Sequence, residues 1–565
     1  MSDETPARGA ICDLDLTAGG VLAPDLLQQL DRLAAAEIAP FDAFIATLGA
    51  GLERDIDWWV SRPASRNNFV SQLFNRCVQL HLVQNLLAEM RPMRVRVDDE
   101  AFAAVLAQLP GVTVTLARSS RRSRLRLALH DIASSMFHTA AAAAAAWSSR
   151  SRRQKEMNPD LIALDVFVLR DSVRTGKFQD RYFPGLIEAL PGPLRSRIRY
   201  VPQFYRIRNY RTLFRQLRAN LVPFLLPQDW LRLTDYGFAF GHWWRLRKFW
   251  KLRATYRGVD FTALLQADLA AGRFAQSAIA ALLTYRFWRN PGLPVQQILD
   301  WYEGQDIDHA LAAAINWHGS QIRLTGFRPA CSRMEMAVMP AAHEVAAGVV
   351  PPLMAVTGDG FHREIAKALP DLRTQTAPGL RYTHLAALPR PAPEQERCIL
   401  VTLPLAAETI APLRELIGDA PRRSAKLWLI KPHPATPPGI AEKLFSDRTM
   451  FELVRGNFYD WLPRSALVLG LESSALLEAV AYGVPAICLA RGNIPTKSPF
   501  PNWLDRKWWR ICYSQQDLEE SLAALSAVDS TPDERNVLRH DLLSPADDDN
   551  MRNFLTEMSV PGNAG

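Results

Sequence analysis

The chain has 565 residues, of which 48% are hydrophobic and 22% are charged, and its net charge at pH 7 is +8. This length exceeds what one hydrophobic core supports, and this composition excludes a disordered or fibrous protein, so two or three globular domains are expected. The six cysteines lie far apart without a CxxC pair, which argues against a disulfide framework or a zinc site. The acidic N-terminus and the short apolar runs predict neither a signal peptide nor a membrane span, so the expected location is the cytoplasm.

Along most of the chain, helical segments alternate with short apolar runs, a pattern typical of βαβ units and parallel sheets. Residues 1–24 are expected to form a flexible leader. An N-terminal Rossmann-like domain is predicted over residues 25–390, with helical insertions at about 118–155 and 205–290. Its strands are predicted at 42–49, 93–99, 111–117, 163–172, 197–204, 320–327 and 351–360.

A stretch rich in proline and charge, LPRPAPEQERC at 388–398, is predicted as a linker. A second Rossmann-like domain is predicted over 396–545, and a flexible tail over 546–565. The predicted fold class is therefore α/β, with two doubly wound domains that face a cleft and a basic helical insertion in the first domain. The strands of the second domain are predicted at 398–405, 425–434, 466–474 and 484–492.

Positive charge is concentrated in two segments, 118–155 and 242–258, where Arg and Lys alternate with Trp, Phe or Leu. Such a surface suits anionic lipid headgroups, with the aromatic rings at the membrane interface. Nucleic acid is a rival partner for a basic, aromatic surface, and a solvated helix face beside ordinary core aromatics is a third interpretation. We expect peripheral contact with an anionic membrane and no nucleic acid partner.

The motif KPHP, residues 431–434, directly follows the apolar run LWLI. A short apolar run bounded by turn residues predicts a buried strand. In doubly wound sheets, ligands bind beyond the carboxyl ends of the strands, which is where Lys431 and His433 are predicted to lie. By itself, however, this motif is more commonly a rigid turn with a solvated lysine.

A second motif begins where the next predicted strand meets Gly470, and there Ser473 and Ser474 open a helix that carries Glu478. A helix N-terminus exposes unpaired N–H groups and a partial positive charge, and so can bind phosphate. Glu478 lies one turn further on, where it could bond a ribose hydroxyl. A serine at a helix start is usually only an N-cap, but both motifs lie at strand ends of one predicted sheet. Together they predict a shared anion site.

KPHP at 431–434 and ESSALLEA at 472–479 resemble the HP and SS motifs of GT-B-type glycosyltransferases of bacterial surface-polysaccharide biosynthesis. The resemblance is strongest to the transferases that use CMP-activated ulosonic acids, the sialyl- and Kdo-transferases. It implies that His433, Ser473 and Ser474 hold the phosphate of the nucleotide and neighbouring groups. Glu478 belongs to an EA..G.P pattern similar to the nucleotide-sugar helix of many GT-B enzymes.

The same sialyltransferases carry an acidic-acidic-Gly motif that supplies the general base, well over a hundred residues before HP. The segment ILDWYEGQDID, 298–308, stands at that distance and reads Tyr302-Glu303-Gly304, so a tyrosine replaces the first acidic residue. The resemblance implies Glu303 as the base, with Asp300 as the second candidate. Asp359, in the sequence TGDG, is a further acidic candidate.

The resemblance implies a metal-independent transfer of a CMP-activated ulosonic acid to a surface glycan or a lipid-linked acceptor. The departing CMP places negative charge on its phosphate, which His433, Lys431 and the N–H groups near Ser473 could stabilise, so no cofactor is expected. A UDP/GDP-hexose transferase or a glycerol-phosphate transferase of the same fold stays open as an alternative. So does a catalytically degenerate scaffold attached to the inner face of the cell membrane.

Overall fold

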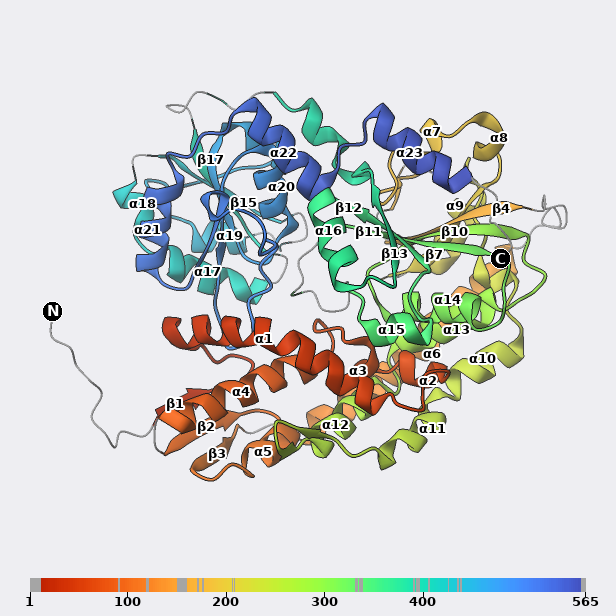
Figure 1. Ribbon diagram of the computed structural model, residues 1–565, viewed down its shortest axis with the longest axis horizontal. Coiled ribbons are helices and arrows are strands. Elements are labelled where there is room, and N and C mark those ends of the chain that lie inside the picture. Colours follow the sequence, from red (N-terminus) through yellow and green to blue (C-terminus); the bar gives the residue numbers. More distant parts are fainter. Residues whose placement is uncertain are drawn as a thin grey trace.

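The computed structural model describes the chain from residue 12 to residue 559. Three parallel sheets organise the protein, one of three strands and two of six strands (Figure 1), and two short antiparallel pairs lie outside them. This architecture confirms the predicted α/β class with two doubly wound sheets and adds a third, smaller sheet. Within its limits the description leaves out residues 90–91, 118–120, 150–159, 170–171, 175–176, 206, 208, 331–333, 335–338, 390–391, 393–396, 405–406, 425, 434–435 and 437–438.

The three-stranded sheet, in the order β1-β2-β3, forms an N-terminal unit with the helices that pack against it. Cys12–Asp15, predicted as part of a flexible leader, instead forms β1 and pairs in parallel with β2. The strand predicted at 42–49 is wrong, because Phe41, Phe44 and Leu48 are buried at the spacing of a helix face. The elements are β1, α1 (Pro24–Leu48), α2 (Ile56–Trp59), α3 (Arg62–Ser65), α4 (Leu73–Glu89), β2 (Met93–Val97), α5 (Glu100–Leu106) and β3 (Val112–Leu116).

The middle sheet has the strand order β13-β12-β11-β10-β4-β7, and all neighbouring strands are parallel. Chain order reverses between β4 and β10, which is the topological switch point of this sheet. Strand β10 is not predicted from the sequence because Gln297 and Asp300 interrupt its apolar run, although both side chains are buried. The strands are β4 (Leu161–Val168), β7 (Ile198–Phe204), β10 (Val295–Trp301), β11 (Arg323–Arg328), β12 (Leu353–Thr357) and β13 (Arg373–Ala377).

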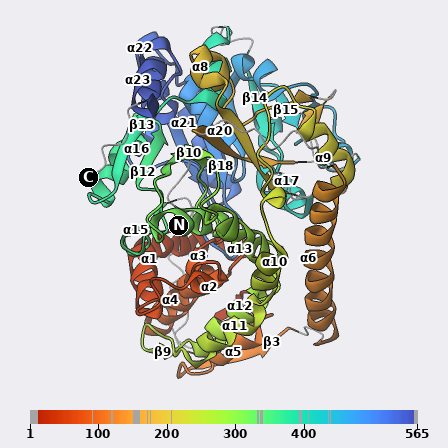
Figure 2. The same ribbon diagram turned by 90° about the vertical axis from the view of Figure 1, so that its right-hand side faces the viewer.

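Helices fill most of the two predicted insertions. Helix α6 runs as a long rod along one side of the molecule (Figure 2) and packs against α9 and α13. Its basic N-terminal side chains, residues 121–129, lie outside the described residues. The helices are α6 (Arg121–Ser149), α9 (Tyr210–Arg218), α10 (Leu233–Phe240), α11 (His242–Arg245), α12 (Thr262–Gly272) and α13 (Gln276–Trp288), with the 3-10 helices η2 (Pro227–Asp229) and η3 (Leu246–Lys251).

Shorter elements and further helices connect the strands of the middle sheet. They are α7 (Leu186–Ala189), α8 (Gly192–Arg195), α14 (Asp306–Asn316), α15 (Ala342–Ala347), α16 (Asp359–Ala368) and η5 (Leu380–Ala387), with the hairpins β5 (Val173–Arg174) to β6 (Lys177–Phe178) and β8 (Thr255–Tyr256) to β9 (Val259–Asp260).

The C-terminal sheet has the order β16-β15-β14-β17-β18-β19, again entirely parallel. This is the 3-2-1-4-5-6 order of a Rossmann sheet, with its switch point between β14 and β17. All four strands predicted here are confirmed. The strands are β14 (Cys398–Thr402), β15 (Trp428–Lys431), β16 (Phe451–Leu453), β17 (Ser465–Gly470), β18 (Ala486–Leu489) and β19 (Trp509–Cys512).

Helices and 3-10 turns connect the strands of this sheet or follow its last strand. They are η7 (Ala407–Thr409), α17 (Ile410–Ile417), α18 (Ala420–Arg423), α19 (Ile440–Leu444), η8 (Phe458–Asp460), η9 (Leu462–Arg464), α20 (Ser474–Tyr482), η10 (Arg506–Trp508), α21 (Gln515–Leu525), α22 (Pro532–Leu543) and α23 (Asp548–Ser559).

The last two helices return to the middle sheet. Residues Asp548–Ser559, predicted as part of a flexible tail, form α23, and Phe554 on this helix is buried with its ring centroid 5.8 Å from that of Phe327 in β11. At the crossing, the N–H of Gly379 donates to the carbonyl oxygen of Ser544 at 2.6 Å. One apolar cluster contains buried side chains of both six-stranded sheets and of α22, so the two halves pack against each other.

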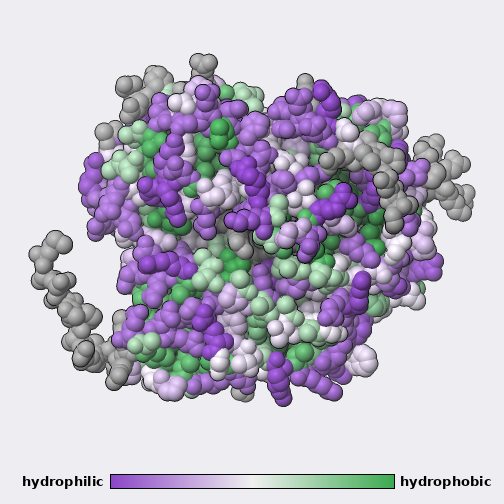
Figure 3. All heavy atoms as spheres, viewed as in Figure 1, coloured by the Kyte–Doolittle hydropathy of each residue, from purple (hydrophilic) through white to green (hydrophobic). Residues whose placement is uncertain are grey.

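Hydrophilic residues cover most of the upper half of the face shown in Figure 3, whereas apolar and intermediate residues are more frequent in its lower half. None of the helices in the described part of the chain is both long and apolar enough to cross a bilayer.

Candidate active site

Three neighbouring strand ends form the edge of the C-terminal sheet at its switch point. In register, Thr402 at the end of β14 lies beside Lys431 of β15 on one side and Gly470 of β17 on the other. A Cβ at Gly470 would lie 2.5 Å from the hydroxyl oxygen of Thr402, so this close approach requires glycine. Ligands of doubly wound sheets bind above such an edge, and both predicted motifs lie at it.

The KPHP turn starts from this edge. The half-buried Lys431 donates from Nζ to the carbonyl oxygen of Pro432 at 3.0 Å, and burial lowers the pKa of its ammonium group. His433 follows on the exposed side of the turn, and its carbonyl oxygen accepts from the N–H of Thr436 at 2.9 Å. Burial and the charge of Lys431 lower the pKa of His433, which favours a neutral imidazole that can donate one hydrogen bond. Pro434 lies outside the described residues.

The serine motif opens helix α20 as predicted. Ser473 is its N-cap, and its hydroxyl oxygen accepts from the N–H of Ala475 at 3.3 Å. Ser474 is the first helical residue and donates from Oγ to Oε1 of Glu478 at 3.4 Å. The first N–H groups of α20 thus lie just beyond Gly470, at the same sheet edge as Lys431.

The Glu478 carboxyl is buried rather than displayed on the helix surface. Its second oxygen, Oε2, accepts from the hydroxyl of Tyr459 at 2.5 Å, and burial raises the pKa of this carboxyl. A hydrogen bond to a ribose hydroxyl, as expected from the sequence, would have to replace or extend the bonds to Tyr459 and Ser474. Glu478 therefore lies at the site mainly as an anchor for these two hydroxyl groups.

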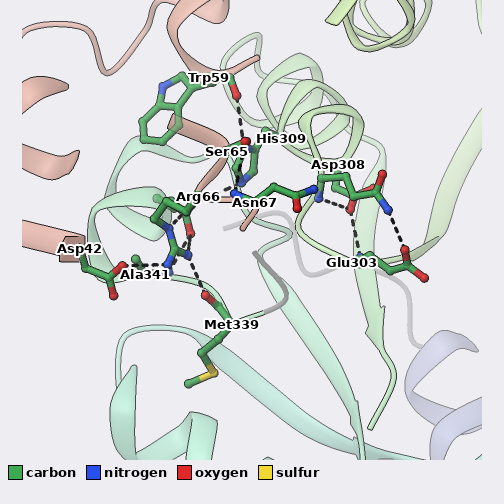
Figure 4. A network of polar contacts seen from close by, with 12 residues as sticks. Asp42, Trp59, Ser65, Arg66, Asn67, Glu303, Asp308, His309, Met339 and Ala341 are labelled. Carbon is green, nitrogen blue, oxygen red and sulfur yellow. Dashed lines mark hydrogen bonds and ion pairs between the residues drawn. The ribbon is translucent and has the colours of Figure 1, made fainter. Parts of the chain in front are cut away.

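Glu303 lies in the turn directly after β10, at the switch point of the middle sheet (Figure 4). Its carboxylate accepts two hydrogen bonds. One comes from Trp301 Nε1 to Oε1 at 2.9 Å, and the other, drawn in Figure 4, comes from Gln305 Nε2 to Oε2 at 2.7 Å. The backbone is fixed as well, because Oδ2 of Asp308 accepts from the N–H groups of Glu303 and Gln305 at 3.0 and 2.9 Å. This partly exposed carboxylate is thus oriented by donors on both sides.

Asp300 lies one layer deeper. It is 2% exposed, it pairs in register with Asp165 of β4, and its Oδ2 has no hydrogen-bond partner among the described residues. Burial raises the pKa of Asp300 well above its usual value, and the carboxylates of Asp308, Asp165 and Glu303 raise it further. A carboxyl buried in a central strand cannot reach an acceptor hydroxyl, so the structure disfavours Asp300 as the base.

Asp359 is the first residue of α16, and its Oδ1 accepts from the hydroxyl of Ser544 at 3.3 Å. It therefore lies where the C-terminal helices cross back over the middle sheet, and this contact gives it a structural role. Among the described residues, no group of three or more His, Cys, Asp or Glu side chains is arranged to hold a metal ion.

Residues of η5 lie between the two sheet edges of the candidate site. No motif in the sequence indicated that they belong to it. The ring centroids of His384 and Tyr459 lie 3.8 Å apart, which brings η5 against the C-terminal domain beside Glu478. In a 3-10 helix, residues three apart share a face, so Arg381 lies on the same side as His384.

The charge of Arg381 reaches both halves of the site. Burial acts to lower the pKa of Arg381, but Tyr382, Glu478, Tyr182 and Tyr459 together raise it. The ring of Tyr182 lies 5.0 Å from that of Trp301, which itself holds Glu303. Arg381 as a whole residue is nevertheless exposed to solvent.

A cavity of about 360 Å³ lies elsewhere, between α1 and the segment 339–343. Its lining includes Arg66, which donates to Glu344 Oε1 and Oε2 at 2.9 and 2.7 Å, to Asp42 Oδ1 at 2.8 Å and to the Met339 carbonyl oxygen at 2.7 Å (Figure 4). Because four of the five N–H groups of Arg66 already donate within the protein, and because the cavity lies at neither switch point, the strand ends are the better candidate site.

The chain matches no protein-family model and no curated protein. Several solved structures are similar at low identity. UDP-GlcNAc 2-epimerase from Neisseria meningitidis bound to UDP-GlcNAc is 12% identical, with 70% of this chain and 99% of that chain covered and a TM-score of 0.39. MurG of Acinetobacter baumannii is 11% identical, with 71% and 99% covered and a TM-score of 0.38. The calicheamicin glycosyltransferase CalG4 is 10% identical, with 70% and 94% covered and a TM-score of 0.37.

Proposed function

We propose that the protein is a glycosyltransferase that moves a sugar from a nucleotide donor, a CMP-activated ulosonic acid, to a surface glycan or a lipid-linked acceptor. One observation carries the proposal: Lys431, Gly470 and the Ser473 helix start share the edge of one sheet at its switch point. Glu303 lies at the switch point of the other sheet, and Arg381 lies between the two halves. Glycosyl transfer requires groups that bind the donor phosphate, which the edge of the C-terminal sheet would supply, and a base, which the edge of the middle sheet would supply.

In the proposed reaction, the acceptor hydroxyl gives its proton to the Glu303 carboxylate as its oxygen bonds to the anomeric carbon of the donor. The bond between that carbon and the phosphate oxygen breaks, and CMP leaves with the electron pair. The N–H of His433, the ammonium of Lys431 and the first N–H groups of α20 stabilise the charge on the leaving phosphate. Arg381 would neutralise a further anionic group of the donor, and Glu303 returns its proton to water.

A nucleotide panel tests this proposal. Thermal shifts measured with CMP, CDP, UDP and GDP should single out CMP, and the matching activated sugar should then yield a transfer product. Stabilisation by UDP or GDP without CMP would support the hexose-transferase alternative, and stabilisation by CDP alone the glycerol-phosphate alternative. A chain that binds none of the four would support the degenerate scaffold.

A lipid-linked acceptor would be presented at the inner face of the cell membrane, where a cytoplasmic enzyme would meet it as a peripheral protein. This part of the proposal rests on the basic and aromatic segments of the N-terminal half rather than on the site itself.

A further inference from the structure

Helix α11 and the 3-10 helix η3 form one continuous segment whose inner face is firmly anchored. His242, Leu246 and Phe249 point inward and are almost fully buried. Nδ1 of His242 lies 2.7 Å from Oδ1 of Asp57, and Arg245 Nε donates to Oδ2 of the same carboxylate at 2.7 Å. The outer face of the segment is therefore held in a fixed orientation.

Three indoles project from that outer face. Trp243, Trp244 and Trp250 are 41%, 60% and 44% exposed within a stretch of eight residues. Single exposed apolar side chains are normal on soluble proteins, but a contiguous group of them marks an interaction site. Exposed cationic side chains stand among the indoles: Arg247, Lys248 and Lys251.

Helix α6 extends the same surface. Ser135 of α6 donates from Oγ to the carbonyl oxygen of Phe274 at 2.8 Å, and the ring of Phe274 stacks on Trp243 at a centroid distance of 6.3 Å. Next to Ser135, Met136 and Phe137 are 57% and 61% exposed. Through Phe274, the described part of α6 thus lies beside the exposed indoles of α11 and η3, in the half of the molecule opposite the C-terminal sheet (Figure 1, Figure 2).

We infer that this surface docks the protein on a membrane that contains anionic lipid. We name it the aromatic-basic surface and define it by Met136, Phe137, Trp243, Trp244, Arg247, Trp250, Lys251 and Phe274.

Its chemistry matches the membrane interface in two ways. Indole rings settle at the level of the headgroups, and Lys and Arg attract anionic lipid phosphates. The guanidinium of Arg247 lies over the ring of Trp243, 5.2 Å from its centroid, so charge and aromatic surface occupy the same place. The exposed Met136 and Phe137 side chains add apolar area that acyl chains can cover.

Docking in this orientation would bring the protein to a lipid-linked acceptor, and only this consequence rests on the proposed function. Vesicle binding is therefore measured without any nucleotide or sugar. The wild-type chain should sediment with phosphatidylglycerol-containing vesicles and hardly with pure phosphatidylcholine, and added salt should weaken the binding.

Two double variants separate the contributions. Trp243→Ala with Trp244→Ala should lower the partition coefficient by about tenfold or more. Arg247→Ala with Lys251→Ala should lower it by roughly fivefold for each charge removed. Val537→Ala and Arg552→Ala, exposed residues on α22 and α23, are the matched apolar and charged controls and should bind like the wild type. Circular dichroism checks that each variant is folded.

The inference is overturned if the wild type does not bind the anionic vesicles, or if both double variants bind them as well as the controls. Binding to single-stranded RNA that depends on the same residues, without vesicle binding, would replace the membrane by nucleic acid. If vesicle binding follows the predicted pattern while no nucleotide binds, the proposed donor chemistry fails and the docking surface stands.

Discussion

The indole Nε1 of Trp301 donates a hydrogen bond of 2.9 Å to Oε1 of Glu303, so the last residue of β10 orients the carboxylate that the proposed reaction uses as its base. Gln305 holds the other oxygen from the opposite side at 2.7 Å. The position of this carboxylate is fixed by two hydrogen bonds next to the strand end. These bonds limit the orientations that the carboxylate can adopt toward an acceptor hydroxyl.

Replacing Glu303 by Gln should abolish transfer while leaving the fold and CMP binding intact. Gln keeps the size of the side chain but cannot take the acceptor proton, so we expect turnover to fall by about a hundredfold or more. Initial rates and calorimetric CMP binding measure the two effects. Glu520→Gln, on the exposed side of α21, is the control. Turnover equal to that of the wild type would remove Glu303 from the mechanism.

Replacing His433 by Ala should weaken nucleotide binding before it affects anything else. The loss of one hydrogen bond to a charged phosphate should lower the affinity for CMP by roughly tenfold or more, and Lys431→Ala should have an effect of the same order. Isothermal titration with CMP measures both, with His540→Ala as the control. If His433→Ala kept its affinity for CMP, CDP and UDP alike, the proposed phosphate site would be wrong.

Arg381→Gln should reduce the affinity for the sugar-linked donor, because the positive charge between Glu478 and Tyr182 is lost. Arg381→Lys should restore part of it, since a lysine keeps the charge without the planar fork. Comparing CMP with the CMP-linked sugar shows which group Arg381 neutralises. A loss confined to the linked sugar indicates its carboxylate, and an equal loss for both ligands indicates the phosphate. No loss for either would exclude Arg381 from the site.

Asp300→Asn should stabilise the protein near neutral pH. Burial raises the pKa of Asp300, and it raises that of the neighbouring Asp165 to about 7, so the folded state must hold protons that the unfolded chain releases above about pH 4. The wild type therefore loses stability as the pH rises from about 4 through the raised pKa values of these two carboxyls. The amide of the Asp300→Asn variant does not titrate, so the variant should lose less stability over the same range. Urea unfolding at pH 5 and pH 8 should show a smaller difference for the variant. An unchanged difference would contradict this account.

Glu344→Gln should destabilise the protein at neutral pH by roughly 3 kcal/mol. Burial acts to raise the pKa of Glu344, but the charge of Arg66 lowers it from 4.5 to about 2. The stabilisation is thus fully present above about pH 4.5 and is lost as the pH falls toward 2. Unfolding free energies measured across that window should slope for the wild type and be flatter for the variant. Parallel curves would refute this assignment.

The strands that the sequence predicts correctly are those whose own residues carry the whole signal. Short apolar runs between turn residues form β14, β15, β17 and β18. Such a run is sufficient for a strand that is buried on both faces of a parallel sheet. The Ser473 N-cap and the end of β15 at Lys431 are local features of the same kind. The predicted leader and tail differ from the structure because β1 and α23 are stabilised by partners far away in the chain.

By itself, the sequence determined the two doubly wound sheets, the two motifs at strand ends and the acidic candidates. Only the tertiary structure decided that Glu303 rather than Asp300 faces outward, because burial in a central strand depends on the neighbours of that strand. It likewise brought Arg381 and Tyr459 to Glu478, and Phe274 to Trp243. These pairs lie far apart in the chain, and no local pattern of residues encodes which distant side chain will lie beside another.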